Sequence, residues 1–175
     1  MEDMERRGLT ILYTGHGKGK TTAALGQVLR AVGHGFSVCV VQFIKGRWPT
    51  GEAKACASLA GVEFHVTGSG FTWKQSPEES RSAAEEGWAL AEGKIMSGAF
   101  DLVVLDELTY VINYGLVEEG RILEVIRRRP PRVHLVVTGR DASPALVREA
   151  ELVTEMREVK HPYAEGVKAQ PGIEF

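Results

Sequence analysis

Cysteine is scarce in this sequence, which has only Cys39 and Cys56 among its 175 residues. Two cysteines rule out the disulfide framework of a small secreted domain, and neither has the spacing of a metal site. An excess of one charge is also lacking, because 21 Lys and Arg against 23 Asp and Glu leave a net charge of −2. We therefore expect no bulk attraction to nucleic acid or to an anionic membrane.

Long apolar runs are missing too. No stretch reaches the ~20 residues that a transmembrane helix needs, and the charged start MEDMERRG is unlike a signal or transit peptide. These absences predict a soluble, cytoplasmic protein. A chain of this length supports one domain with a substantial core, which we place over residues 1–175.

Short apolar segments alternate with helical patterns along the chain. The predicted strands, rich in β-branched and apolar residues, are 9–14, 37–43, 62–67, 102–108 and 133–139, with a sixth possible at 152–160. The predicted helices are 20–35, 76–96, 115–129 and 143–150. Several strands are continuous apolar runs, as expected where both faces of a sheet are covered. The pattern predicts an α/β fold with a mostly parallel sheet and helices on both faces.

In such sheets, ligands bind at the carboxyl ends of the strands. Residues that follow the predicted strands should therefore lie along one edge of the sheet. They are Thr14, Phe43, Thr67, Glu107 and Arg140.

A glycine-rich loop follows the first predicted strand, where residues 14–22 read TGHGKGKTT. The segment Gly19-Lys20-Thr21 matches the end of the phosphate-loop pattern G-x-x-x-x-G-K-[ST], although Thr14 stands at its first glycine position. Closely spaced glycines let the backbone direct several N–H groups at one anion.

The helix that begins at Lys20 adds its positive dipole end to this loop. Lys20 adds a point charge, and the Thr21 hydroxyl is a suitable ligand for Mg²⁺. Strand, loop and helix occur in the required order, which favours a phosphate cradle over a flexible turn.

An acidic pair, Asp106 and Glu107, ends the apolar segment LVVLDE. In phosphate-loop proteins a carboxylate at this place completes the Mg²⁺ site, directly or through water. The sequence does not decide which of the two binds the ion directly. The residues thus predict a site for a nucleoside triphosphate and Mg²⁺.

The cradle alone does not fix the reaction, because hydrolysis, phosphoryl transfer and nucleotidyl chemistry all use it. A generic phosphate-loop ATPase or small-molecule kinase is one alternative. A RecA-like regulatory or DNA-bound module is another, although the net charge of −2 opposes it.

Several segments together resemble the bacterial phosphate-loop family of ATP:corrinoid adenosyltransferases. They are TGHGKGKTTAALG, VVQFIKG followed by GE, GFTW, LVVLDELTYVINYGLV, VVTGR and VKHPYAEGVKAQPGIEF. The resemblance extends from Thr14 to the last residue. Thr14 is itself a feature of that family, whereas His16 stands where the family has Asn.

The resemblance implies a RecA-like fold and an unusual use of ATP. A Co(I) corrinoid, either cobalamin or a precursor, attacks the ribose 5′ carbon, and triphosphate leaves. ATP and the corrinoid are then substrates and Mg²⁺ is the cofactor, in adenosylcobalamin synthesis or salvage. A flavoprotein reductant and a homodimer are also implied, while the preferred corrinoid, the reductase and the dimer interface stay open.

The resemblance also implies roles for individual residues. The triphosphate is expected to contact Gly15, His16, Gly17, Lys18, Gly19, Lys20, Thr21 and Thr22. Thr21 and Glu107 hold Mg²⁺, Arg140 contacts phosphate or ribose, and Arg30 is a further nucleotide candidate. Phe71 and Trp73, from GFTW, displace the lower ligand of the corrinoid. His161 and Lys168 are candidates for capping the site.

Overall fold

Six parallel strands form the centre of the protein in a computed structural model that describes residues 7–44, 46, 50–68 and 76–174. The strands are β1 (Thr10–Thr14), β2 (Val38–Gln42), β3 (Val62–Val66), β4 (Leu102–Asp106), β5 (His134–Thr138) and β6 (Leu152–Glu155). Their order across the sheet is β3-β2-β4-β5-β1-β6, and each neighbouring pair is parallel.

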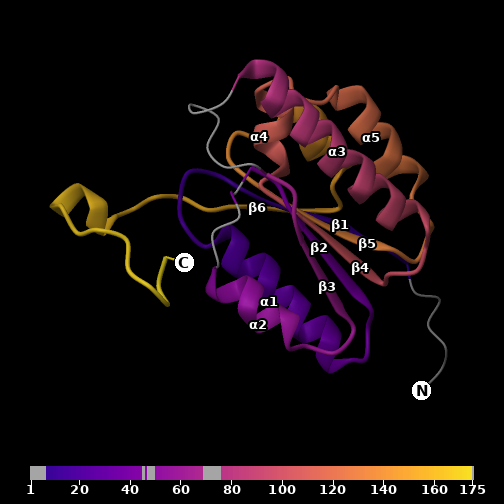
Figure 1. Ribbon diagram of the computed structural model, residues 1–175, viewed down its shortest axis with the longest axis horizontal. Helices are drawn as coiled ribbons and strands as arrows, with labels where there is room; N and C mark the ends of the chain where they lie inside the picture. The colour runs from indigo at the N-terminus through magenta and orange to yellow at the C-terminus, as the bar shows by residue number, and fades with distance from the viewer. Residues whose placement is uncertain (1–6, 45, 47–49, 69–75, 175) are drawn as a thin grey trace.

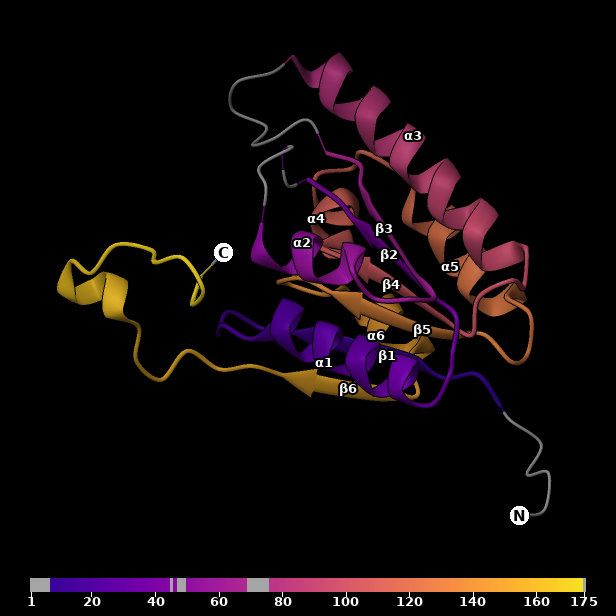
Figure 2. The same ribbon diagram turned by 60° about the horizontal axis from the view of Figure 1, so that its bottom comes forward.

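Helices cover both faces of this sheet (Figures 1 and 2). They are α1 (Lys20–Gly33), α2 (Gly51–Ala57), α3 (Pro77–Met96), α4 (Leu108–Asn113), α5 (Glu119–Arg128), α6 (Pro144–Glu149) and the 3₁₀ helix η2 (Pro162–Glu165). In the figures α1 and α2 lie on one face, and α3, α4 and α5 lie on the other. The predicted α/β class, with a parallel sheet and helices on both faces, is confirmed.

Successive side chains of a strand point to opposite faces of the sheet, so each face has its own hydrophobic core. On β2, Val40 packs into the cluster that contains Val28 of α1, whereas Val41 packs into the cluster that contains Trp88 of α3. Both strand residues are at most 1% exposed. The central strands therefore read as continuous apolar runs, because neither face is open to water.

The long helix α3 begins where its sequence signals predict. The Ser76 hydroxyl accepts a hydrogen bond from the Glu79 backbone N–H, and the Glu79 carboxylate accepts one from the Ser76 N–H. This capping box satisfies two N–H groups that have no partner within the helix. Together with Pro77 it fixes the start of α3.

The sequence patterns did not predict α2, α4 and η2, and they placed the start of α5 too early. Gly115 has φ 60° and lies just after α4, so α5 begins only at Glu119. Among the described helices, none combines the length and apolar character that a membrane crossing requires.

The expected edge of the sheet is present. Thr14 ends β1, Phe43 directly follows β2, Thr67 directly follows β3, and Glu107 directly follows β4. Because all the strands are parallel, these residues share one edge. The glycine loop leaves the sheet at this edge and leads into α1.

Candidate active site

The glycine loop is shaped by backbone conformations that favour glycine. Gly15 has φ 93° and Gly19 has φ 106°, both in the left-handed region. A Cβ atom on Gly15 would lie 2.5 Å from the Met156 carbonyl oxygen. The loop therefore needs glycine both for its turns and for its close approach to the chain after β6.

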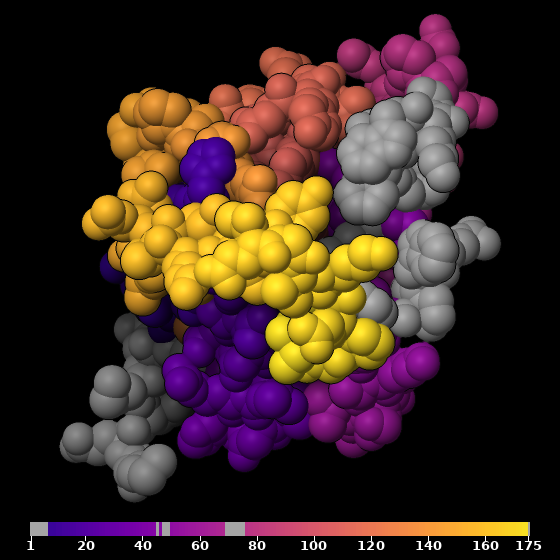
Figure 3. Space-filling model, turned by 90° about the vertical axis from the view of Figure 1, so that its left-hand side faces the viewer, coloured from indigo at the N-terminus to yellow at the C-terminus, as the bar shows by residue number. Residues whose placement is uncertain are grey.

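Backbone that follows β6 braces the loop from behind. The Gly17 N–H donates to the Met156 carbonyl oxygen at 2.7 Å, and the Met156 N–H donates to the Thr14 carbonyl oxygen at 2.8 Å. The Lys18 ammonium also forms an ion pair with Glu174. Figure 3 shows the C-terminal segment lying across the N-terminal part of the chain. The last part of the sequence is thus built into the cradle.

Lys20 lies folded back onto this loop. Its ammonium donates to the carbonyl oxygens of Gly15 and Gly17 at 2.7 and 2.6 Å. Burial lowers the pKa of Lys20 below its ordinary value, and the positive charge of Arg140 acts in the same direction. The carboxylate of Glu107 opposes that shift in the pKa of Lys20. Charges of both signs therefore gather around the start of α1.

The N-terminus of α1 has no side-chain cap. Gly19 occupies the capping position and the first turn contains no acidic residue. The positive end of this helix dipole and its first N–H groups are therefore not neutralised by a capping side chain or an acidic residue in the first turn. That arrangement suits an anion.

Asp106 organises a buried network beneath the loop. One carboxylate oxygen accepts hydrogen bonds from the Thr21 hydroxyl at 2.9 Å and the Thr138 hydroxyl at 2.7 Å. The other accepts one from the Gln42 amide at 2.8 Å. Asp106 is only 1% exposed, so these donors replace the water that its charge would otherwise bind.

Glu107 occupies a different environment although it is the next residue. It is half-buried, has φ 65°, and immediately precedes α4. Its backbone N–H donates to the Thr138 hydroxyl oxygen at 2.9 Å, so Thr138 contacts both members of the acidic pair. This contact fixes Glu107 in a conformation that non-glycine residues rarely adopt.

The oxygen groups at this point suit Mg²⁺. The Thr21 hydroxyl donates its proton to Asp106, which leaves the oxygen lone pairs of Thr21 for a cation. Hydroxyl and carboxylate oxygens are the ligands that Mg²⁺ prefers. Thr21 with Glu107, and Asp106 behind them, would supply this donor set.

The turn after β5 contributes a second charged group. Gly139 has φ 141°, and a Cβ atom there would lie 2.0 Å from the Thr109 hydroxyl oxygen. Arg140 follows and is exposed. A carboxylate oxygen of the next residue, Asp141, lies 3.0 Å from the His16 Nε2 atom of the glycine loop. The structure thus joins this turn to the loop.

A model of the family described as ATP:corrinoid adenosyltransferase BtuR/CobO/CobP matches residues 6–175. The chain belongs to this family. The match includes both the glycine loop and the C-terminal segment that braces it.

Named relatives resemble the chain over almost its whole length. The corrinoid adenosyltransferase of Escherichia coli K12 is 44% identical over 172 residues, which cover 98% of this chain and 87% of that protein. The corrinoid adenosyltransferase of Pseudomonas aeruginosa PAO1 is 44% identical over 173 residues, covering 98% and 85%. The corrinoid adenosyltransferase CobA of Salmonella typhimurium LT2 is 44% identical over 172 residues, covering 98% and 87%.

Not every predicted site residue reaches the cradle in this member of the ATP:corrinoid adenosyltransferase family. Arg30 lies ten positions after Lys20 on α1, about 15 Å along the helix. It lines a cavity of about 170 Å³ with His34 and His134, beside the first residues of β4 and β5. The structure therefore does not bring Arg30 to the loop, because a straight helix carries it to the opposite edge of the sheet.

For four other predicted residues, the described part of the chain records no contact with the cradle. Phe71 and Trp73 lie outside the described residues. The His161 ring accepts a hydrogen bond from the Tyr163 N–H at the start of η2. Lys168 is exposed. The roles of all four residues stay predictions.

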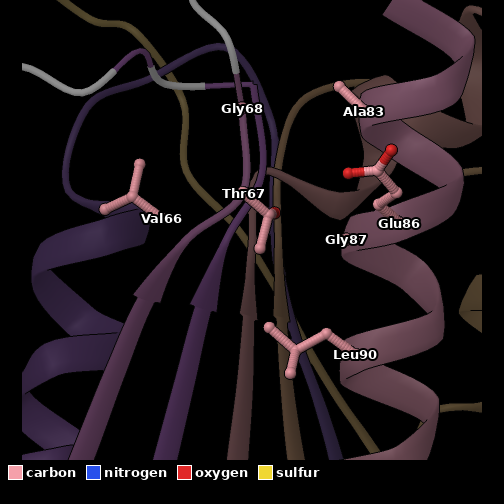
Figure 4. Close-up of a pocket in the computed structure, with 7 residues that line it drawn as sticks. All are labelled: Val66, Thr67, Gly68, Ala83, Glu86, Gly87 and Leu90. Atoms are coloured by element: carbon pink, nitrogen blue, oxygen red, sulfur yellow. The ribbon is translucent and has the colours of Figure 1, made fainter.

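A larger pocket, of about 630 Å³, opens at the carboxyl end of β3. It lies between that strand end and α3 (Figure 4). The residues that line it are Val66, Thr67, Gly68, Ala83, Glu86, Gly87 and Leu90. This pocket is on the same edge of the sheet as the cradle.

Sequence reasoning missed Gln42, Thr138 and Met156. Gln42 and Thr138 are the last residues of β2 and β5, the two neighbours of β4, so their side chains meet Asp106. The sequence did carry a signal for Gln42 and Thr138, because each is a polar residue at the end of an apolar strand. Met156 acts through its backbone, for which a side-chain pattern gives no signal.

Proposed function

We propose that this protein transfers the 5′-deoxyadenosyl group of ATP to the Co(I) centre of a corrinoid. The cobalt supplies the electron pair of the new carbon–cobalt bond. The bond between C5′ and the α-phosphate oxygen breaks, and its electrons leave with triphosphate. The observation that carries the proposal is a phosphate cradle in a chain that is 44% identical, over nearly its whole length, to named corrinoid adenosyltransferases.

The cradle would act on the leaving group. In this reaction negative charge develops on the triphosphate, and fixed N–H groups and cations stabilise such charge strongly. Lys20 would exchange the carbonyl oxygens of Gly15 and Gly17 for phosphate oxygens. Arg140 would add a second cation from the turn after β5. These groups favour departure of triphosphate.

Thr21 and Glu107 would hold Mg²⁺, with Asp106 orienting the Thr21 hydroxyl. The bound ion would supply further positive charge to the triphosphate. The protein needs no nucleophile or general base of its own, because Co(I) is the nucleophile. Its remaining task is to align the two substrates and to exclude water.

Phe71 and Trp73 would act on the corrinoid. Two aromatic side chains beneath the corrin plane would replace the lower nitrogen ligand with an apolar surface. Axial ligation is a main control on the potential of a macrocyclic metal, so this exchange would make Co(II) easier to reduce. We further propose a flavoprotein electron donor, a homodimer and a cytoplasmic location.

The reaction products test the proposal. Wild-type protein incubated with ATP, Mg²⁺ and chemically reduced corrinoid should release triphosphate in a one-to-one ratio with adenosylated corrinoid, and no ADP. A Lys20→Ala variant should lose most of this activity, whereas Lys54→Ala, an exposed change on α2, should retain it. Release of ADP that does not depend on corrinoid would instead identify an ATPase or a kinase.

A further inference from the structure

The pocket between β3 and α3 has two kinds of wall. Figure 4 shows Thr67 and Leu90 facing each other across its lower part, with Ala83 and the Glu86 carboxylate on the α3 side. Val66 points to the other side of the strand. Among the described residues, the lining thus combines apolar side chains with the Thr67 hydroxyl and the Glu86 carboxylate, and none of these described lining residues is cationic.

The described lining residues do not favour a phosphate ligand. Glu86 would repel a phosphate group, and none of the other described lining residues carries a positive charge to offset that repulsion. Apolar side chains beside a carboxylate acceptor instead suit a flat heteroaromatic ring that carries an N–H donor. The Ser82 hydroxyl donates to the Glu86 carboxylate at 3.3 Å, which helps to hold the acceptor in place.

The position of the pocket fits the geometry of the proposed reaction. β3 and β1 are separated by β2, β4 and β5, so the pocket lies about 19 Å across the sheet edge from the glycine loop. Transfer requires triphosphate, ribose C5′ and cobalt to follow one another in a row, and we take this row to run along that edge. The nucleotide tail of a complete corrinoid leaves the corrin face opposite to the one that accepts the adenosyl group, so it would come last in this row.

We propose that the pocket binds the heteroaromatic base of this nucleotide tail after the base has left cobalt. The inference rests on the proposed adenosyl transfer. The base buries its ring against Leu90 and Ala83. The ring nitrogen that leaves cobalt takes up a proton from water, and the resulting N–H donates to the Glu86 carboxylate. The pocket thereby distinguishes a complete corrinoid, such as cobalamin, from cobinamide, which has no nucleotide tail.

Close packing beneath the pocket keeps its shape. Gly87 contacts the strand, and a Cβ atom there would lie 2.6 Å from the Thr67 hydroxyl oxygen. The Thr67 hydroxyl in turn donates to the Gln42 carbonyl oxygen at 3.3 Å. We therefore avoid Gly87 as a test position, because its substitution would move α3 as a whole.

The test uses two alanines of the same helix. Ala83 lines the pocket and is half-buried, whereas Ala89 is exposed. Ala83→Trp fills the pocket, and Ala89→Trp is the matched control. KM and kcat are measured for cobalamin and cobinamide, each chemically reduced to Co(I), with saturating ATP. Thermal unfolding shows whether each variant is folded.

We expect Ala83→Trp to raise the ratio of KM for cobalamin to KM for cobinamide roughly tenfold or more, the loss expected when a bicyclic ring is excluded from an apolar site. Ala89→Trp should leave this ratio unchanged. Glu86→Gln, an exposed change that spares the fold, should raise the ratio by a smaller factor. An unchanged ratio in both Ala83→Trp and Glu86→Gln would overturn the inference. Wild-type protein that adenosylates neither corrinoid would instead overturn the proposed function.

Discussion

Thr138 joins the two acidic residues of the site, so its hydroxyl should contribute strongly to stability. The hydroxyl donates to the Asp106 carboxylate at 2.7 Å and accepts from the Glu107 N–H at 2.9 Å. Thr138 is fully buried, at 0% exposure. Thr138→Val keeps the shape of the side chain but removes both hydrogen bonds.

The size of the effect follows from the two bonds. A hydrogen bond to a charged group contributes about 1.5–3 kcal/mol, and a buried N–H left without an acceptor costs about 1–3 kcal/mol. The two losses share one atom and need not add fully. We therefore expect Thr138→Val to lower the free energy of unfolding by about 3 kcal/mol. Activity should fall as well, because the backbone of Glu107 loses its anchor.

Thr10 provides a matched control in the neighbouring strand. It is also 0% exposed, and its hydroxyl has no hydrogen-bond partner in the described part of the chain. Thr10→Val should therefore leave the free energy of unfolding unchanged or raise it by about 1 kcal/mol. Urea denaturation of both variants at pH 7 measures the difference. Equal losses in the two variants would refute the reasoning, because burial alone would then explain the effect.

Four further predictions concern charges and aromatic residues. Lys20→Ala should lower kcat/KM about tenfold to a hundredfold, since a charge-assisted hydrogen bond is worth about 1.5–3 kcal/mol; unchanged kinetics in a folded variant would contradict the assignment. Glu107→Gln should raise the Mg²⁺ concentration needed for half-maximal activity, and an unshifted Mg²⁺ titration would indicate that Asp106, not Glu107, binds the ion directly. Burial tends to raise the pKa of Glu151, but the Thr10 N–H and neighbouring arginines outweigh it and hold that pKa below its ordinary value. Glu151→Gln should therefore destabilise the protein at pH 7, and its difference from wild type in urea unfolding should vanish as the pH falls through that lowered pKa; a difference that persisted in acid would exclude the charge as its cause. Replacing Phe71 and Trp73 together with Ala should nearly abolish activity with a biological reductant and spare much of it with chemically supplied Co(I); equal losses in the two assays would rule out displacement of the lower ligand.

The strands and the cradle could be predicted because each depends on short-range pattern. Apolar runs located β1 to β5, β6 occupies the first part of the segment 152–160 where a sixth strand was only possible, and TGHGKGKTT placed a loop and the start of α1 at Lys20, as observed. The short helices α2 and α4 escaped prediction because tertiary packing, more than local propensity, stabilises helices of so few turns. The start of α5 was misplaced because Gly115 adopts a left-handed conformation after α4.

Residue groups that meet only through the sheet were beyond sequence reasoning. Gln42 and Thr138 meet Asp106 because β2 and β5 both flank β4, and strand order is not visible in a single sequence. Cys39 shows the same limit. Its thiol lies within 4.8 Å of ligand atoms of Glu63 and His65, although its spacing predicted no such cluster.

The brace behind the glycine loop has a consequence for synthesis of the chain on the ribosome. β1 pairs with β5 and β6, the last two strands to be made, and the Gly17 N–H bonds to the Met156 carbonyl oxygen. The residues of the cradle therefore leave the ribosome early but lack their supporting backbone until almost the whole chain has emerged. Nascent chains and fragments that end before Met156 should gain no stability from ATP, whereas the finished protein should, because a ligand stabilises only the state that binds it.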